Sequence, residues 1–322
     1  MNNSEFDVIK KYFTFSNSRD DVILAGGDDC ACVSVPENKQ LLITTDTLIC
    51  GVHFPENTSP EDIAYKSLMV NLSDLAAMGA TPAWVTLAIS LPDINENWLQ
   101  AFSNQFSAVL SKFNISLIGG DTTKGALSIT IQAMGVSDKN KILRRDQAEL
   151  NDKIFVTGNI GDASVGLQAV LNQLDDKNLL SCVNSLNRPE ARVDFAEELT
   201  LYSKCAIDIS DGLVADLGHI VSASFCGANI NLSDIPLSSA TRYYFDFYHK
   251  STTDWSMVLT QGDDYELCFT VNKENESAVI SLAKKHQLKV SCIGEVTDSD
   301  KLIFTDSNNE VVNFSSTGFK HF

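Results

Sequence analysis

The 322-residue sequence is poor in basic residues, with 24 Lys and Arg against 42 Asp and Glu and a formal net charge of −18. A protein that binds nucleic acid needs a basic face toward the phosphate backbone, so we expect no nucleic-acid partner. The same charge would repel a polyphosphate unless bound cations reversed the local sign. Any phosphate site in this chain is therefore expected to use metal ions.

Long apolar runs are also missing. The longest fall far short of the roughly 20 residues that cross a bilayer. Met1 to Phe6 contains no basic region followed by an apolar stretch, so the sequence predicts no signal peptide. We expect a cytoplasmic protein without a membrane partner.

The cysteines do not form a metal or redox motif. Cys30 and Cys32 make a Cys-x-Cys rather than a Cys-x-x-Cys pair, and no His cluster accompanies them. The eight thiols are expected to be reduced, with several filling the core, such as Cys268 and Cys292.

Strand and helix patterns alternate along the chain, which favours an α/β or α+β fold. Gln40 to Thr45 and Leu127 to Val136 are predicted strands. Between them, Ser59-Pro60-Glu61-Asp62 is typical of a helix start, and Gly79 is its expected stop. The stripe that this helix should bury consists of Ala64, Leu68, Leu72 and Leu75.

A polar stretch from Ser137 to Asp152 separates two halves. The second half restarts with a predicted strand, Lys153 to Thr157, and a helix that opens at Gly161-Asp162. We expect two domains, residues 1–150 and residues 151–322.

Acidic residues beside Gly, Ser or Thr recur at six places over about 240 residues. Oxygen ligands of this kind, without His or Cys pairs, indicate Mg²⁺ rather than zinc. The six stretches are Gly27-Asp28-Asp29, Thr44-Thr45-Asp46-Thr47, Asn71-Leu72-Ser73-Asp74, Gly119-Gly120-Asp121-Thr122, Asp208-Ile209-Ser210-Asp211-Gly212 and Gly262-Asp263-Asp264-Tyr265-Glu266.

The first two stretches offer ligands at predicted turns and strand ends. Adjacent side chains diverge in Asp28-Asp29, so we favour Asp29 as the ligand; an ordinary Gly-Asp turn is the alternative. Thr44, Thr45 and Asp46 are expected to end a strand, where hydroxyl and carboxylate oxygens suit Mg²⁺.

Ser67, Asn71 and Asp74 fall on one polar strip of the predicted helix. A solvated helix face explains that strip equally well. The small residues Ala76, Ala77 and Gly79 favour a site, because they let the helix end approach another backbone closely.

Gly119-Gly120-Asp121 follows a short apolar run and predicts a strand, a glycine turn and a carboxylate. It lacks the Lys and the spacing of a P-loop. Later in the chain, Asp208 and Ser210 share one strand face. Asp211 is either a further ligand or the N-cap of the following helix.

Two non-acidic candidates remain. The guanidinium groups of Arg144 and Arg145 suit phosphate, although a solvated linker charge is the alternative. His53 is either a substrate contact or a structural residue.

Together and in this order, these stretches resemble the thiamine-monophosphate kinases of the aminoimidazole ribonucleotide synthetase superfamily. The resemblance extends over nearly the whole chain. Its most specific segment is Asn71 to Ala80, and Ile118 to Thr122, Ile207 to Leu213 and Asp264 to Phe269 also match.

The resemblance implies ATP and thiamine monophosphate as substrates, several Mg²⁺ ions and a homodimer whose N-terminal domains close a barrel. The implied metal ligands are Asp29, Thr44, Thr45, Asp46, Asp74, Asp121, Asp208 and Asp211. The implied ATP contacts are Gly120, Asp121, Arg145 and Ser210, and the substrate contacts are His53, Asp263 and Phe319. Of the acids, Asp46, Asp121 and Asp208 are expected to be catalytic.

Three positions depart from the family pattern. Gly26 stands where a bulkier apolar residue is more usual, and Gln261 replaces a usual Gly. Asp263 replaces a usual Glu, which shortens its reach toward substrate by about one methylene.

The implied reaction needs no general base, because a phosphate monoester is largely ionised at neutral pH. It does need positioning and charge neutralisation, since unit charges about 4 Å apart repel by roughly 4 kcal/mol at an effective dielectric near 20. Other ATP-using members of the superfamily, a metal-dependent phosphatase and a non-catalytic cation-binding protein are the alternatives.

Overall fold

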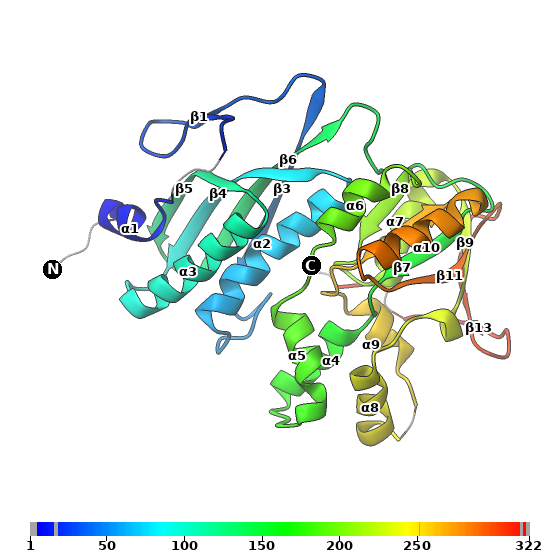
Figure 1. Cartoon of the computed structure of the whole chain (residues 1–322). Coiled ribbons are helices and arrows are strands. Elements are labelled where there is room, and N and C mark those ends of the chain that lie inside the picture. The colour runs from blue at the N-terminus through cyan, green and yellow to red at the C-terminus, as the bar shows by residue number, and fades with distance from the viewer. Residues whose placement is uncertain (1–4, 16–18, 251, 316–317, 320–322) are drawn as a thin grey trace. The chain divides into compact units, whose positions relative to one another are not determined.

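The computed structural model describes residues 5–15, 19–250, 252–315 and 318–319 (Figure 1). The chain divides into two compact units. The first comprises residues 1–75 and 80–140, and the second comprises residues 76–79 and 141–322.

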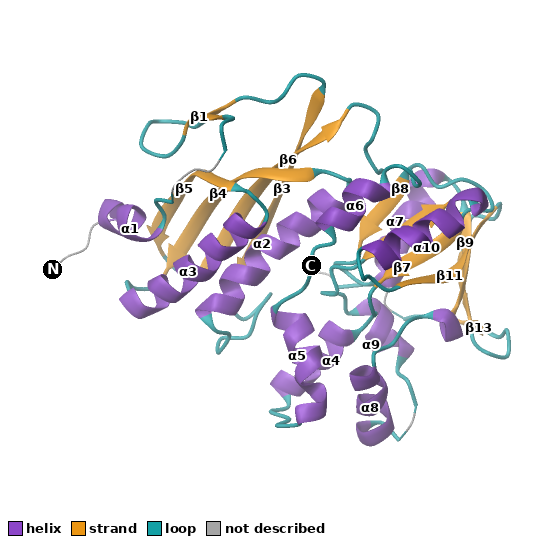
Figure 2. Cartoon of the chain, viewed as in Figure 1, coloured by secondary structure: helices purple, strands orange, loops and turns teal. Residues whose placement is uncertain are grey.

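The first unit contains a four-stranded sheet in the order β3-β6-β4-β5. β3 and β4 each pair antiparallel with β6, whereas β4 and β5 are parallel. Its strands are β3 (Lys39–Ile49), β4 (Thr81–Leu91), β5 (Ser116–Lys124) and β6 (Ser128–Asp138), and its helices are α1 (Glu5–Tyr12), α2 (Pro60–Ala77) and α3 (Glu96–Lys112). Figure 2 shows α2 and α3 on one face of this sheet.

Helix α2 begins as the sequence predicts. The Asp62 backbone N–H donates to Ser59 Oγ at 3.1 Å, which caps the first turn. The predicted stripe is buried, from Ala64 to Leu75. Ser67 and Asn71 are also fully buried, so the solvated-face interpretation of the polar strip is wrong.

The opposite face of the sheet is covered at one end by a small ribbon, β1 (Val22–Leu24) and β2 (Cys32–Val33). Val22, Ala31 and Val33 pack there against a cluster that includes buried Trp84 and Met134. The indole N–H of Trp84 donates to Asp21 at 3.1 Å.

Two strands are longer than the sequence predicts. β3 continues through Thr44–Asp46 to Ile49, so these residues lie inside the strand rather than at its end. β5 likewise continues through Gly119, Gly120 and Asp121 to Lys124. The predicted glycine turn is therefore wrong, because all three residues pair with β4 in the sheet.

The second unit contains a mixed seven-stranded sheet in the order β13-β12-β9-β11-β7-β10-β8. The strands are β7 (Lys153–Thr157), β8 (Cys205–Asp208), β9 (Gly227–Asn231), β10 (Leu267–Val271), β11 (Val290–Thr297), β12 (Leu302–Thr305) and β13 (Val311–Val312). The helices are α4 (Asp162–Leu171), α5 (Leu180–Asn187), α6 (Val193–Leu199), α7 (Leu213–Ser224), α8 (Ser239–Tyr248), α9 (Trp255–Thr260) and α10 (Glu276–Lys285), with 3₁₀ turns η1 (Lys177–Leu179), η2 (Leu232–Asp234) and η3 (Lys273–Asn275).

The alternating helices and strands of this unit confirm the α/β prediction. β7 has the predicted bounds, and α4 starts at Asp162 as expected. Cys268 on β10 is buried in the core, as predicted. Cys292 is exposed instead, so its predicted place in the core is wrong.

Candidate active site

Three predicted ligands gather on the helix-covered face of the N-terminal sheet. Thr44 and Asp46 point the same way because they are two residues apart on β3, and α2 supplies Asp74. Thr44 Oγ1 donates a hydrogen bond to Asp74 Oδ2, and the carboxyl group of Asp46 lies beside that of Asp74. The Asp46 backbone N–H donates to Asn71 Oδ1 at 3.2 Å. Buried Asn71 on α2 therefore binds the backbone of β3 at this cluster.

The electrostatics of this cluster favour a cation. Burial raises the pKa of Asp46 from 3.8 to about 6, and the charge of Asp74 beside it contributes to the rise. Two carboxyl groups so close together oppose each other's ionisation, and an added divalent cation would relieve that repulsion.

Other predicted ligands of this unit lie on the opposite face of the sheet. Thr45 is the strand neighbour of Asp46 and so points away from it. Asp121 falls in the same row across the sheet as Thr47, which shares the face of Thr45. Asp29 belongs to the loop whose Ala31 packs over this second face. The sheet thus separates two sets: Thr44, Asp46 and Asp74 on one face, and Asp29, Thr45 and Asp121 on the other.

Gly120 is required by its surroundings in β5. A Cβ at this position would lie 1.9 Å from the carbonyl oxygen of Leu87 on β4. Neighbouring Gly119 would accept a Cβ, because its nearest contact would be 4.0 Å away. Close approach of two strands therefore explains Gly120, whatever else it contacts.

His53 lies in the turn that follows β3. Its Nδ1 accepts a hydrogen bond from the Ile49 backbone N–H at 3.0 Å, and its carbonyl oxygen accepts one from Lys66 Nζ at 3.3 Å. The neutral ring therefore carries its proton on Nε2. These hydrogen bonds give His53 a structural role. Its contact with substrate stays a prediction.

In the second unit, Asp216 organises the loop between β8 and α7. One oxygen, Oδ2, accepts the backbone N–H groups of Ser210, Asp211 and Gly212 at 3.0, 3.0 and 3.1 Å. Gly212 occupies the N-cap position, so the interpretation of Asp211 as an N-cap is wrong. Our sequence reasoning missed Asp216; an acid in the first turn after Asp-Gly was the signal that could have revealed it.

Predicted contacts from distant parts of this unit meet at the same loop. The Asp263 N–H donates to the Ser210 carbonyl at 2.8 Å, and the Phe319 N–H donates to the Asp211 carbonyl at 3.1 Å. Asp263 has φ 68°, a left-handed conformation. A Cβ at Gly262 would lie 2.1 Å from the Ser210 oxygen, so only glycine allows this approach.

Asp208 and Arg145 complete the predicted set. Asp208 ends β8 and is buried. Arg145 is exposed, and in the part of the chain that the structure describes its guanidinium forms no ion pair, whereas Arg144 pairs with Asp146 at 2.5 Å. Of the two arginines, Arg145 is thus the one available to a ligand.

The last acids of the Gly262–Glu266 stretch, Asp264 and Glu266, form hydrogen bonds within the second unit. Both Asp264 oxygens accept the Gly161 N–H, at 3.0 and 3.1 Å, and burial raises the pKa of Asp264 well above its usual value. Glu266 accepts two hydrogen bonds from Arg192, at 2.8 and 2.5 Å, and one from Thr157. Arg192 was missed from the sequence, because nothing local marks it as the partner of a residue 74 positions away.

Across the described ranges, no three His, Cys, Asp or Glu side chains lie close enough together to hold a metal ion by themselves. Within those ranges there is also no helix long and apolar enough to span a membrane.

Comparison with known proteins gives the class first. Residues 27–137 match the N-terminal domain of AIR synthase related proteins, and residues 150–307 match the C-terminal domain of the same proteins. The chain is therefore a two-domain AIR synthase related protein.

Full-length relatives then give the family. The chain is 44% identical over 326 residues to the thiamine-monophosphate kinase of Haemophilus influenzae, covering 99% of this chain and 98% of the relative. The crystal structure of the Stenotrophomonas maltophilia thiamine-monophosphate kinase superposes with a TM-score of 0.84 at 40% identity, covering 92% of this chain and 93% of that one. A further structure, AaThiL complexed with AMPPCP and TMP, has a TM-score of 0.79 at 30% identity, covering 92% and 91%. The chain belongs to the thiamine-monophosphate kinase family and is a kinase.

Proposed function

We propose that this protein transfers the γ-phosphoryl group of ATP to thiamine monophosphate, forming thiamine diphosphate for thiamine diphosphate biosynthesis in the cytoplasm. The observation that carries the proposal is the full-length likeness to AaThiL, which is complexed with AMPPCP and TMP. The acidic cluster of Thr44, Asp46 and Asp74 supports it, because phosphoryl transfer requires charge neutralisation.

The donor chemistry fits Mg²⁺. This ion is commonly held by one or two carboxylates together with substrate phosphate oxygens rather than by a cage of protein ligands. Pairs such as Asp46 and Asp74 suit that mode. We assign the ions to Asp29, Thr44, Thr45, Asp46, Asp74, Asp121, Asp208 and Asp211. When bound, Mg²⁺ neutralises the phosphate charges that would otherwise repel.

The remaining roles are positional. Ser210 lies in a loop that is held by three hydrogen bonds to Asp216, and exposed Arg145 offers several N–H donors in a fork. Ser210, Arg145 and Gly120 bind ATP. Asp263 and Phe319 are hydrogen-bonded through their backbones to the same loop, and with His53 they bind thiamine monophosphate. Asp46, Asp121 and Asp208 are the catalytic acids through their Mg²⁺ ions.

No side chain of the chain needs to remove a proton. The accepting phosphate oxygen is already largely ionised at neutral pH, because the second pKa of a phosphate monoester is about 6. Catalysis then consists of in-line positioning and electrostatic stabilisation.

The domain assignment follows the same scheme. Residues 1–150 would bind ATP and Mg²⁺ and form the dimer, and residues 151–322 would complete the substrate site. β3 supports the dimer, because it is an edge strand of its sheet. It also exposes Leu41, Ile43 and Ile49, by 41%, 57% and 41%. Pairing of two such sheets would close the barrel.

The test is a chromatographic assay of purified protein with ATP, Mg²⁺ and thiamine monophosphate. We expect thiamine diphosphate and ADP in equal amounts, and no product when EDTA removes the metal. Release of free phosphate without thiamine diphosphate would identify a phosphatase. Product formation in EDTA would overturn the role of Mg²⁺.

A further inference from the structure

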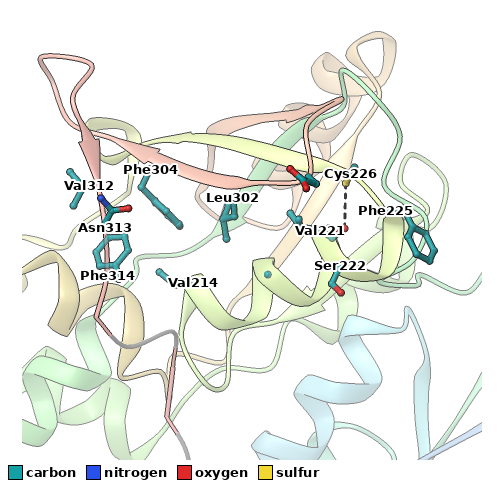
Figure 3. Close-up of a pocket in the computed structure, with 12 residues that line it drawn as sticks. Val214, Val221, Ser222, Phe225, Cys226, Leu302, Phe304, Val312, Asn313 and Phe314 are labelled. Atoms are coloured by element: carbon teal, nitrogen blue, oxygen red, sulfur yellow. Dashed lines mark hydrogen bonds between the residues drawn. The ribbon is translucent and has the colours of Figure 1, made fainter.

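The groove along helix α7 in the second unit has a volume of about 660 Å³, and Val221, Leu302 and Phe304 are among the residues that line it (Figure 3). Its walls are largely apolar, and nothing in the described chain shows what covers them, so no ligand is assigned to this groove. A charged cluster in the first unit is more informative, because it holds the loop that bears a predicted metal ligand.

The ribbon of β1 and β2 lies over β4, β5 and β6 of the N-terminal sheet and carries Asp29 in the loop between its two strands (Figure 1). This ribbon has little packing of its own. β1 and β2 contain only three and two residues, and Ile23 is 66% exposed. A Cβ at Gly26 or Gly27 would meet no heavy atom within 4 Å. The position of the loop therefore depends on how the ribbon is fastened to the sheet.

Asp21, the residue before β1, provides that attachment. Its Oδ1 accepts the indole N–H of Trp84 at 3.1 Å and the Nε–H of Arg19 at 2.9 Å, and its Oδ2 accepts Arg19 Nη2 at 2.5 Å. Its carbonyl oxygen accepts the backbone N–H of Ser34, the residue after β2, at 2.8 Å. Trp84 is fully buried on β4, so Asp21 joins both ends of the ribbon to a fixed point of the sheet.

Arg19 completes the cluster. Its guanidinium lies 5.5 Å from the centroid of the Trp84 ring, and its Nη1 donates to the Asn114 carbonyl at 3.1 Å. Hydrogen bonds from Arg19 lower the pKa of Asp21, so this carboxylate is ionised at neutral pH. The side chains of Arg19 and Asp21 are only 15% and 18% exposed. A bidentate ion pair with so little exposure fixes its geometry more firmly than a surface ion pair does.

The cluster lies on the sheet face that holds the second set of predicted ligands. Trp84 pairs with Met134 on β6. Thr45 pairs with Gln132, two residues before Met134, so Thr45 and Trp84 share one face. Gln132 Nε2 donates to Thr45 Oγ1 on this face at 3.4 Å. The ribbon therefore carries Asp29 on the same side of the sheet as Thr45.

We propose that Asp21 is a positioning residue, which together with Arg19 and Trp84 holds the ribbon where Asp29 can share a Mg²⁺ ion with the sheet. This inference rests on the proposed function, because that function assigns Mg²⁺ to Asp29 and Thr45. Asp21 itself needs no contact with the ion or with either substrate.

The test compares the full chain with Asp21→Asn, which removes the charge and keeps the shape of the side chain. In the absence of Mg²⁺ and substrates, hydrogen–deuterium exchange is expected to rise at least about tenfold for the amides of residues 22–34 alone. The Mg²⁺ concentration that gives half-maximal turnover is expected to rise about tenfold, with turnover at saturating Mg²⁺ nearly unchanged. Arg19→Gln should give the same two shifts, and the double variant no larger ones, because the two residues act as one unit.

Phe102→Leu is the matched control. Phe102 on α3 is fully buried beside Phe106, and α3 covers the other face of the sheet, so this change lowers stability without touching the ribbon (Figure 2). The urea midpoint should fall, while the exchange of residues 22–34 and the Mg²⁺ midpoint stay those of the wild type. If Asp21→Asn does not fold, Trp84→Phe replaces it, because it removes the N–H donor and keeps an aromatic ring.

Unchanged exchange in Asp21→Asn would refute the attachment, and faster exchange with an unchanged Mg²⁺ midpoint would refute the positioning role. An equal shift of the Mg²⁺ midpoint in Phe102→Leu would reduce the effect to lost stability and overturn the proposal. A wild type that forms no thiamine diphosphate would refute the proposed function, and the exchange measurement would still decide whether Asp21 holds the ribbon.

Discussion

Half-buried Asp46 and buried Asp216 are both acids with raised pKa values, but their neighbours differ. Burial and nearby Asp211 raise the pKa of Asp216 to about 7, while three backbone N–H groups oppose the rise. Asp216 therefore has its own donors and anchors a loop. Asp46 has another carboxyl group, that of Asp74, beside it, and this group raises its pKa further. A cation would relieve the repulsion between two adjacent carboxylates, which is the residue-scale argument for metal at Asp46.

Asp46→Asn is expected to lower turnover at least about 100-fold without unfolding the protein, because it removes a charge proposed to hold Mg²⁺. Thiamine diphosphate formation by chromatography measures the loss. Circular dichroism checks the fold, and Asp246→Asn at an exposed position of α8 is the control. Wild-type turnover by Asp46→Asn would remove this residue from the catalytic set.

The raised pKa of Asp46 predicts that the stability of the metal-free protein depends on pH in an unusual direction. The pKa of Asp46 is higher in the folded state, about 6, than its ordinary 3.8. The folded state thus binds this proton more tightly than the unfolded state does. The free energy of unfolding of the wild type therefore falls by about 3 kcal/mol as the pH rises between these two values. Asp46→Asn should lack that loss. Urea unfolding in EDTA at about pH 4 and about pH 8 measures the difference; parallel pH profiles would contradict it.

At the scale of elements, residues that look like turns in the sequence lie inside strands. Gly119, Gly120 and Asp121 have turn composition, yet β4 pairs with all three in parallel register. A local pattern cannot reveal a partner strand some 30 positions away. Strand alternation then decides which side each residue faces, so Thr44 and Thr45 go to opposite faces.

Gly120→Ala and Gly119→Ala form a matched pair that tests this packing. The new Cβ at Gly120 would overlap the Leu87 carbonyl, so we expect roughly 2–4 kcal/mol of destabilisation. The same change at Gly119 meets only an ordinary contact and should cost less than about 1 kcal/mol. Denaturant midpoints of the two variants measure the effect, and equal losses would refute the close approach as its cause.

At the scale of the whole molecule, the chain is two compact units that each hold part of the proposed machinery. The first unit supplies the Asp46 cluster, and the second supplies the loop of Ser210 with Asp263 and Phe319. The first unit also ends its sheet in β3, an edge strand with exposed apolar residues. Such an edge is normally covered or paired, which is the basis of the proposed dimer.

Ile43→Lys is expected to produce monomers, because it places a charge on the exposed face of that edge. Light scattering after size-exclusion chromatography measures the mass. Phe247→Lys, at an equally exposed position of α8 in the other unit, is the control and should not change the mass. A wild type that is monomeric, or an Ile43→Lys variant that stays dimeric, would reject β3 as the interface.

The sequence by itself determined the α/β class, the start of α2, the strand β7 and the family, because each depends on local periodicity, capping or motif order. Only the tertiary structure decided that Asn71 is buried against β3, that Asp216 rather than Asp211 holds the α7 loop, and that Arg192 pairs with Glu266. It also decided that Asp46 and Asp121 face opposite sides of one sheet. The physical reason is the same each time: these facts depend on pairing between residues far apart in the chain, and one sequence alone carries no record of that pairing.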